Sequence, residues 1–114
     1  KIFHVNWFRT DEEGKFLWPG FGENLRVLEW IVDRATTPEK TENAQETPIG
    51  LVPTTSSINI EGLETTQEQL EDLLKIDPKE WKAEVESQNE FLDKFGEDLP
   101  KEIREEQGKL KDAL

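Results

Sequence analysis

Bulky apolar residues crowd the first nine positions and fall on both alternating faces of that segment. β-branched and aromatic side chains favour extended backbone, so residues 1–9 predict a strand. The polar residues 10–15 include a glycine and predict a turn, after which residues 16–18 predict a short returning strand. The pattern therefore predicts a β-hairpin at the N-terminus of the chain, which Pro19 and Gly20 interrupt.

A helical spacing of apolar residues follows, and those that share one face are Leu25, Leu28, Val32 and Ala35. Asn24 is a favourable N-cap, so the pattern predicts a helix from residue 25 to between residues 33 and 35. Residues 36–47 are polar and show no periodicity, which predicts a mobile surface loop. Residues 48–53 are apolar but bracketed by prolines, so we expect extended backbone that is not a central strand. Residues 58–60 predict a short edge strand.

Short amphipathic helices are predicted for the rest of the chain. Thr65 and Glu68 have the spacing of a capping box for the first of them. Asp77 and Pro78 start the second, which should run to residue 94 before Gly96 ends it. The inner face of this helix should carry Trp81, Val85, Leu92 and Phe95, and a last helix from residues 98–100 onward should carry Leu99, Ile103, Leu110 and Leu114. The predicted fold class is therefore α+β, an N-terminal β-hairpin followed by mainly short amphipathic helices.

The composition describes a lean core. The chain of 114 residues suffices for one small domain, but only 33% of it is hydrophobic and 35% is charged. Four Trp and six Phe residues still provide anchors that disordered chains lack, so we expect a chain that normally packs against something else. The absence of Met suggests that Lys1 is not a natural translation start and that the chain is cut from something longer, or processed.

Most of the net charge of −12 belongs to the second half, since residues 1–59 carry −3 and residues 60–114 carry −9. This acidity argues against nucleic-acid partners, which require a basic surface, and against an anionic membrane. No apolar run approaches the length of a membrane span, about 20 residues. We interpret the acidic residues as the solvated faces of helices. The lack of Cys fits a cytoplasmic location.

Residues suited to catalysis are few. His4 is the one histidine, and because it lies among aromatic residues we expect a packed or capping side chain. Without Cys, no cysteine nucleophile or cysteine zinc site can form. Acidic pairs such as Glu12 and Glu13 lie on predicted turns or exposed helix faces, and no glycine-rich phosphate loop ends in Lys-Ser or Lys-Thr. We therefore predict no catalytic residue and no metal ligand.

The aromatic residues before the first helix suggest a binding site. Phe8, Phe16 and Phe21 come from the two predicted strands and the turn after them, and Gly20 and Gly22 allow a ligand to approach the backbone. The start of a helix offers unpaired N–H groups, and stacking of a base on an aromatic ring contributes about 1–3 kcal/mol. Such a site suits a planar nucleobase such as guanine. In the alternative interpretation, these aromatic residues are simply core.

Together these residues closely resemble the guanine-binding segment of the GTP-dependent phosphoenolpyruvate carboxykinases. The resemblance rests on residues 3–9, 16–24 and 26–30, which read FHVNWFR, FLWPGFGEN and RVLEW. Residues 46–53 (ETPIGLVP) resemble the family's next familiar stretch, and Trp81 and residues 95–100 resemble its C-terminal helices. The string Pro-Gly-Phe-Gly-Glu-Asn is the most specific part, and the family separates from its ATP-using counterpart at this point.

The resemblance implies a bilobal α/β enzyme of gluconeogenesis that converts oxaloacetate and GTP into phosphoenolpyruvate, GDP and CO₂ with Mn²⁺ or Mg²⁺. The chain would be a fragment of its C-terminal lobe, with a guanine-binding segment (residues 1–35), a polar loop and extended stretch (residues 36–57) and acidic helices (residues 58–114). The residues that the resemblance assigns to GTP are Phe8, Phe16, Phe21, Gly22, Glu23 and Asn24, with Trp7 and Trp18 supporting the aromatic slot. Asn24 is the expected discriminator against adenine.

The reaction centre that the resemblance implies is missing from this sequence. The family's phosphate loop, its metal-binding Lys, His and Asp, and its oxaloacetate-binding arginines all precede this region. We therefore expect the chain alone to be inactive and to bind guanine weakly, with the remainder of the parent enzyme as its partner. The alternative from another class is a non-enzymatic acidic helical interaction module with the aromatics as core.

Overall fold

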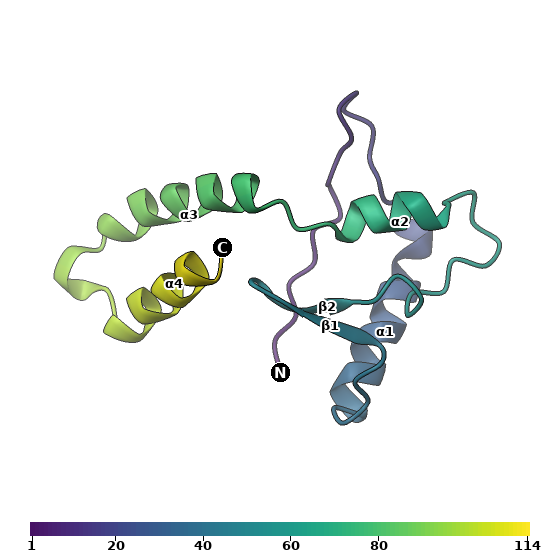
Figure 1. Ribbon diagram of the computed structural model, residues 1–114, viewed down its shortest axis with the longest axis horizontal. Coiled ribbons are helices and arrows are strands. Elements are labelled where there is room, and N and C mark those ends of the chain that lie inside the picture. Colours follow the sequence, from purple (N-terminus) through teal and green to yellow (C-terminus); the bar gives the residue numbers. More distant parts are fainter. The chain divides into compact units, whose positions relative to one another are not determined.

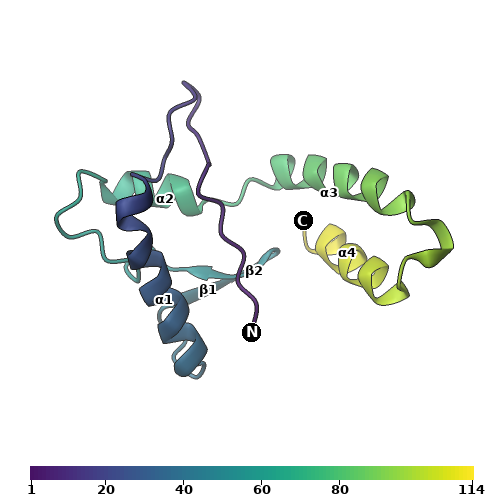
Figure 2. The same ribbon diagram turned by 180° about the vertical axis from the view of Figure 1, so that it is seen from behind.

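The computed structural model describes residues 1–114 as four α-helices, a two-stranded hairpin and two short 3₁₀ helices (Figure 1, Figure 2). The helices are α1 (Asn24–Thr36), α2 (Gln67–Leu74), α3 (Pro78–Asp93) and α4 (Lys101–Ala113), the strands are β1 (Ala44–Thr47) and β2 (Gly50–Pro53), and the 3₁₀ helices are η1 (Phe21–Glu23) and η2 (Gly96–Asp98). The chain forms two compact units, residues 1–46 with 51–75 and residues 47–50 with 76–114. The α+β class is confirmed, but the hairpin is not at the N-terminus.

The core of the first unit contains two indole rings and two aliphatic side chains. Trp18, Trp30, Ile58 and Leu70 are the buried members, each between 1% and 6% exposed. The partly buried residues that pack against them are Trp7, Val27, Ile31, Ala44, Ile60, Leu73 and Leu74. Helix α1 contributes Trp30 to this core, with Val27 and Ile31 beside it. The predicted first helix is confirmed, but the face predicted to be apolar is not the one that packs here, since Leu25, Leu28 and Val32 are exposed.

The predicted strand over residues 1–9 is wrong. Residues 1–6 belong to no strand, and no segment of the chain pairs with them, so their apolar character alone does not produce a sheet. What remains of the predicted N-terminal hairpin is one antiparallel bridge between Thr10 and Phe16. His4 is exposed rather than packed.

Side chains, rather than a sheet, hold the N-terminal segment to the first unit. The ring of Phe3 meets the indole of Trp30 edge to face, with centroids 6.0 Å apart. The guanidinium of Arg9 donates to the carbonyl oxygens of Leu73 (2.8 Å) and Lys75 (2.9 Å). Carbonyl groups at the end of a helix lack partners within that helix. Arg9 supplies partners for carbonyl groups at the end of α2, and the same hydrogen bonds fix the N-terminal segment.

The segment predicted as a mobile loop, residues 36–47, ends in strand β1. Asn43 anchors it, because the buried Asn43 amide donates to a carboxylate oxygen of Asp33 at 2.6 Å. The backbone carbonyl of Asn43 also accepts from the indole N–H of Trp30 at 2.7 Å. The loop prediction is wrong for residues 44–47, whose sequence AQET lacks the alternation of apolar residues that marks a strand.

The apolar stretch after β1 follows its prediction only in part. The extended backbone expected for residues 48–53 is confirmed for Gly50–Pro53, which form β2, but residues 48–49 form the turn of the hairpin instead. The edge strand predicted for residues 58–60 is wrong, since none of them lies in a strand. Ile58 belongs to the buried core instead, so its side chain rather than its backbone determines its position.

Helix α2 has a capping box one residue later than predicted. The Thr66 hydroxyl accepts from the Gln69 N–H at 3.2 Å, and the Gln69 side chain accepts from the Thr66 N–H at 2.8 Å. The prediction of Thr65 and Glu68 is therefore wrong by one position. Both pairs fit the same sequence pattern, and Thr66, whose backbone is extended (φ −83°, ψ 163°), forms the box with Gln69.

The second unit consists mainly of α3 and α4. The carboxylate of Asp77 accepts from the N–H groups of Lys79 (2.8 Å) and Glu80 (3.4 Å), and Pro78 occupies the first turn, so the predicted start of α3 is confirmed. Phe95 was expected on the inner face but is 47% exposed, which leaves Val85 as the buried residue of α3.

Polar contacts join α3 to α4. The guanidinium of Arg104 donates to side-chain oxygens of Asn89 (2.6 Å), Asp93 (2.8 Å) and Gln107 (2.9 Å). The Gln107 amide in turn donates to the carbonyl of Val85 at 3.3 Å. The predicted last helix is confirmed as α4, although Ile103 of its expected seam is 47% exposed.

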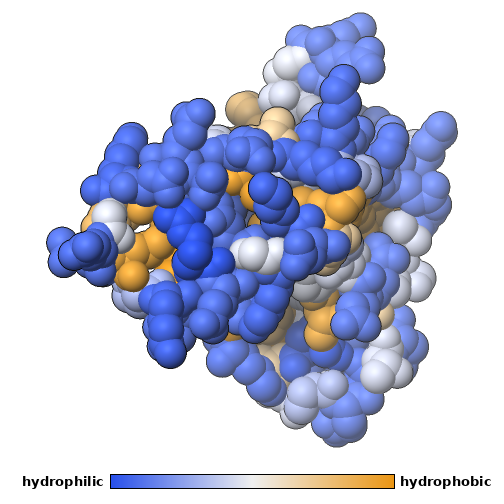
Figure 3. Space-filling model, turned by 60° about the vertical axis from the view of Figure 1, so that its left-hand side comes forward, coloured by the Kyte–Doolittle hydropathy of each residue, from blue (hydrophilic) through white to orange (hydrophobic).

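Large apolar side chains are exposed in both units, as expected of a lean core. Leu25 on α1 is 74% exposed and Phe91 on α3 is 56% exposed. Hydrophobic surface is visible between hydrophilic residues on the face drawn in Figure 3. None of the helices has the length and apolar character that crossing a membrane requires.

Candidate nucleotide-binding site

The predicted site residues divide into exposed phenylalanines and buried tryptophans. Phe8, Phe16 and Phe21 are 73%, 58% and 92% exposed, whereas Trp18 is 4% exposed. Trp7 is half-buried and packs against Trp18, with ring centroids 6.4 Å apart. The interpretation of the aromatics as core therefore holds for the indole rings but not for the three phenylalanine rings.

Phe8 and Phe16 lie together, although they do not sit on paired strands. Their ring centroids are 6.1 Å apart and their planes are inclined at 62°, an edge-to-face arrangement. The bridge between Thr10 and Phe16 brings the two rings close, and a hydrogen bond of 3.0 Å from the Phe8 N–H to the Asn6 side chain fixes the turn before it. The rings present an aromatic surface to solvent.

Phe21 stands on the 3₁₀ turn η1, which leads directly into α1. The turn closes through the N–H of Glu23 on the carbonyl of Gly20 (3.0 Å) and the N–H of Asn24 on the carbonyl of Phe21. The N–H groups of Phe21 and Gly22 come before the first of these bonds, so they have no partner within the turn. Gly20 has a φ of 121°, a conformation that requires glycine.

Gly22 needs a different explanation from Gly20. Its φ is not positive, and a Cβ atom added there would meet nothing within 4 Å. The fold of the chain therefore gives no steric reason for a glycine at this position. A group outside the chain that approaches the backbone closely would provide one.

Asn24 does not act as the predicted N-cap. Its backbone is helical (φ −60°, ψ −28°), because η1 starts the helical backbone three residues earlier, and Glu23 precedes α1 without a side-chain cap. The Asn24 side-chain oxygen instead accepts from the indole N–H of Trp18 at 2.9 Å. The N-cap prediction is wrong because the partner of Asn24 is a buried side chain, not the helix backbone.

The carboxylate of Glu23 is engaged within the chain. It accepts from the guanidinium of Arg26 at 2.7 Å, and Arg26 also donates to the carbonyls of Asn59 (2.8 Å) and Glu61 (3.0 Å). Arg26 thereby ties the start of α1 to the segment after β2. The sequence analysis did not single out Arg26, and the one local signal was its position three residues after an acidic residue.

The far end of α1 carries the one carboxylate of this unit with a shifted pKa. Hydrogen bonds from Lys40 (3.0 Å) and Asn43 (2.6 Å) and the charge of Arg34 lower the pKa of Asp33. The same contacts hold the loop before β1 against the helix, so this shift has a structural cause.

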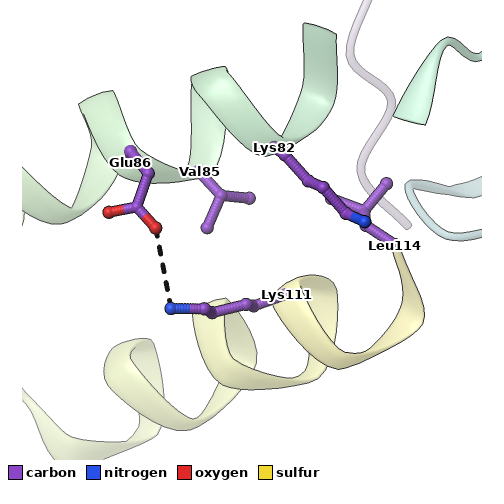
Figure 4. A pocket seen from close by; sticks show the side chains of 5 residues that line it. All are labelled: Lys82, Val85, Glu86, Lys111 and Leu114. Atoms are coloured by element: carbon purple, nitrogen blue, oxygen red, sulfur yellow. Dashed lines mark ion pairs between the residues drawn. The ribbon is translucent and has the colours of Figure 1, made fainter. Parts of the chain in front are cut away.

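Two cavities lie away from these residues, in the second unit. Cavities of about 230 and 270 Å³ lie between α3 and α4, and the smaller one is lined by Lys82, Val85, Glu86, Lys111 and Leu114 (Figure 4). An ion pair of 3.6 Å between Lys111 and Glu86 spans it. No group of three or more His, Asp or Glu side chains in the chain could hold a metal ion.

Comparison with known proteins identifies relatives over the whole chain. Residues 1–113 match the family model described as the phosphoenolpyruvate carboxykinase C-terminal P-loop domain. The chain is 46% identical over 114 residues to the GTP-dependent phosphoenolpyruvate carboxykinase of Chlamydia muridarum, covering all of this chain and 19% of that protein. The corresponding protein of Paenarthrobacter aurescens is 48% identical over 114 residues, covering all of this chain and 18% of that protein. That of Chlamydia felis is 50% identical over 106 residues, covering 93% of this chain and 17% of that protein.

The chain thus spans about a fifth of the length of the curated relatives it matches. The match takes in the Phe8 to Asn24 segment, the hairpin and all four helices, since it reaches from residue 1 to residue 113. The chain therefore belongs to the family of GTP-dependent phosphoenolpyruvate carboxykinases, in the part described as their C-terminal P-loop domain.

Proposed function

We propose that this chain supplies the guanine-binding segment of a GTP-dependent phosphoenolpyruvate carboxykinase. The observation that carries the proposal is the exposure of Phe8, Phe16 and Phe21 ahead of α1, next to buried indole rings in the same segment. Exposed phenylalanine rings are unfavourable in water, and a flat base that covers one adds about 1–3 kcal/mol.

The polar half of the site would come from the start of the helical backbone. The unpaired N–H groups of Phe21 and Gly22, together with the Asn24 amide, can hydrogen-bond the edge of a base. The absence of a Cβ at Gly22 leaves room for that base to approach. Glu23 contributes through its backbone, because its carboxylate is paired with Arg26.

The parent enzyme would convert oxaloacetate and GTP into phosphoenolpyruvate, GDP and CO₂ as a step of gluconeogenesis in the cytoplasm. The Mn²⁺ or Mg²⁺ ion of that reaction does not fit the side chains of this chain, which form no suitable group of ligands. The metal, phosphate and oxaloacetate sites would therefore lie in the rest of the enzyme. The isolated chain should show no carboxykinase activity above background.

The rest of the parent enzyme is also the partner that the surface of α1 suggests. Leu25, Leu28 and Val32 are 74%, 44% and 59% exposed and recur along one face of that helix. Leaving such a face in water is unfavourable. Contact with the remainder of the enzyme would bury it.

Titration with GTP and ATP, followed by tryptophan fluorescence, tests the proposal. Trp7 and Trp18 lie beside the site, so GTP should change the emission more than ATP does. Phe21→Ala and Asn24→Ala should remove the response to GTP without unfolding the chain. Phe91→Ala, which removes an exposed ring from the other unit, should leave it intact.

Three results would contradict parts of the proposal. A response that survives both Phe21→Ala and Asn24→Ala would place the nucleotide elsewhere. The absence of any response in the chain and in the longer enzyme would favour the acidic interaction module. Oxaloacetate-dependent turnover by the isolated chain would refute the assignment of the reaction centre to the rest of the enzyme.

A further inference from the structure

We propose that Trp18 is a positioning residue for base selection, which holds the Asn24 carboxamide so that its NH₂ group faces the nucleotide. The inference rests on the function proposed above. The observation behind it is the hydrogen bond of 2.9 Å from the Trp18 indole N–H to the Asn24 side-chain oxygen.

The chemistry of the two groups fixes the direction of the amide. An indole N–H can only donate, so it can pair with the oxygen of a carboxamide but not with its nitrogen. Trp18 is 4% exposed within the core, and a buried donor without a partner is unfavourable. Rotating the Asn24 amide by half a turn would set two donors against each other and leave the indole N–H without a partner. The buried indole therefore determines which end of the amide points inward.

The other end of the amide is free to read a ligand. Its NH₂ group donates to no other group in the chain, and no side-chain nitrogen or oxygen of the chain is buried without a partner. Solvent therefore reaches the NH₂ group. Asn24 directly follows η1, the turn that carries Phe21 and the unpaired N–H groups. A base stacked there would present its edge to a donor.

A fixed donor distinguishes the two purines. Guanine carries an acceptor, O6, where adenine carries a donor, the N6 amino group. The outward NH₂ group of Asn24 pairs with O6 and opposes the adenine amino group. A carboxamide free to rotate would satisfy either base and would lose the discrimination. The role of Trp18 is thus to fix which end of the Asn24 carboxamide faces the base, since its oxygen and NH₂ ends have nearly the same shape.

The test uses Trp18→Phe in the longer enzyme, which keeps an aromatic ring in the core and removes the N–H donor. The measured quantity is the ratio of kcat/KM for GTP to that for ATP. GTP and ATP carry the same triphosphate, so the ratio isolates the base. We expect the ratio to fall by about tenfold or more. Loss of folded protein alone would lower both values equally and leave the ratio unchanged.

Trp30→Phe is the matched control. Trp30 is also a buried member of the core, 6% exposed, and its indole N–H donates to the carbonyl of Asn43 at 2.7 Å. The substitution therefore removes the same kind of donor from the same core at a position away from Asn24. We expect the ratio to stay within about twofold of the wild-type value.

The nucleotide ITP and a tryptophan analogue of the same shape at position 18 sharpen the test. ITP keeps O6 and lacks the 2-amino group of guanine, so the ITP-to-ATP ratio should fall in Trp18→Phe as the GTP-to-ATP ratio does. If Trp18→Phe does not fold, benzothienylalanine at position 18 keeps the shape of the indole and replaces only its N–H by sulfur. The same fall in both ratios is expected there.

The outcomes separate this inference from the function it depends on. If Asn24→Ala lowers the GTP-to-ATP ratio while neither change at Trp18 does, the positioning role is refuted and the proposed function stands. If Asn24→Ala leaves the ratio unchanged and Phe21→Ala weakens neither nucleotide, the proposed function fails as well. A fall for GTP without a fall for ITP would also refute the inference, because the amide would then read another part of the base.

Discussion

The two units of the chain expose aromatic rings for different physical reasons. In the second unit, Phe91 and Phe95 stack edge to face at 5.4 Å because they are one helical turn apart on the same stretch of chain, and the Lys94 ammonium lies 5.8 Å from the Phe91 ring. Local spacing explains that arrangement completely. In the first unit, Phe8 is exposed in a turn and Phe21 on the 3₁₀ helix η1, and no spacing within one α-helix pairs either ring with another.

Long-range hydrogen bonds fix the irregular backbone of the first unit. Arg9 reaches carbonyls at the end of α2, 64 residues away at Leu73, and Arg26 reaches Asn59, 33 residues away. Ordering a loop is unfavourable in conformational entropy, so a loop that is fixed by distant contacts and still exposes its apolar rings is consistent with the binding role proposed above. The comparison separates exposed rings that local structure explains from those that it does not.

Removing the centre of the first core should have the largest effect. Leu70 is 1% exposed, and Leu70→Ala should destabilise the first unit by about 2–5 kcal/mol. The response to GTP should be lost with the fold, because α2 then no longer supports the segment that Arg9 anchors. Denaturant unfolding combined with amide hydrogen exchange measures the change unit by unit.

Val85→Ala is the corresponding change in the second unit, where Val85 is 3% exposed. It should loosen α3 and α4 and leave the amides of α1 protected. Equal loss of protection in both units after either substitution would contradict the division into two units.

Removing the contacts of Arg9 should have the next largest effect on stability. Arg9→Ala removes two hydrogen bonds from a charged donor to carbonyls at the end of α2, a loss of about 1–3 kcal/mol for the segment they hold. Exchange of the Leu17 amide, which bonds to the Arg9 carbonyl, should become faster, and GTP should bind more weakly. Lys15→Ala, a neighbouring loss of charge, should change neither quantity. If the GTP response persisted in Arg9→Ala, the aromatic segment would not depend on this anchor.

A cap substitution should affect the second unit alone. The Asp77 carboxylate satisfies two N–H groups at the start of α3, so Asp77→Ala should lower its stability by about 0.5–2 kcal/mol. Circular dichroism and exchange of the α3 amides measure the change, and Asp77→Asn, which keeps a capping oxygen, should restore most of it. The response to GTP should be unchanged, and its loss would show that the two units do not act separately.

The smallest effect on stability should come from Gly22. A Cβ meets nothing there and φ is not positive, so Gly22→Ala should change stability by about 0.5 kcal/mol or less, yet it should weaken GTP binding by filling the space for the base. Gly20→Ala should do the opposite and destabilise the turn, because φ at Gly20 is 121°. Thermal unfolding and the fluorescence titration together separate the two. Undiminished GTP binding by Gly22→Ala would remove the evidence for close approach at this position.

Local sequence rules predicted the helices of this chain better than its other elements. The helix of α1 and the Asp77 and Pro78 start of α3 depend on residues within one or two turns of each other, and both are confirmed. Which face of α1 packs on the core was not predicted, since it depends on distant residues such as Ile58 and Leu70. The predicted capping box of α2 was wrong by one position, because the neighbouring pairs Thr65 and Glu68, and Thr66 and Gln69, fit the same pattern. The strand over residues 1–9 failed because apolar residues favour extended backbone without providing a strand to pair with.

The candidate site was predictable as a set of residues but not as an arrangement. The motif from Phe8 to Asn24 led to the family, which the comparisons confirm. The roles of Trp18 and Arg26 depend on partners that lie close only in the folded chain, namely the Asn24 amide and the carbonyls of the segment after β2. No pattern in the sequence distinguishes a capping asparagine from one that a buried indole holds. The assignment of individual residues to GTP stays a prediction.

The most direct test of the central claim is a titration of the isotopically labelled chain with GTP, followed by its amide resonances. If the segment from Phe8 to Asn24 binds guanine, the amides of Phe21, Gly22 and Asn24 should shift, those of α3 and α4 should not, and ATP at the same concentration should produce smaller shifts. Resonances that do not move between residues 7 and 24, or that move equally with ATP, would contradict the account.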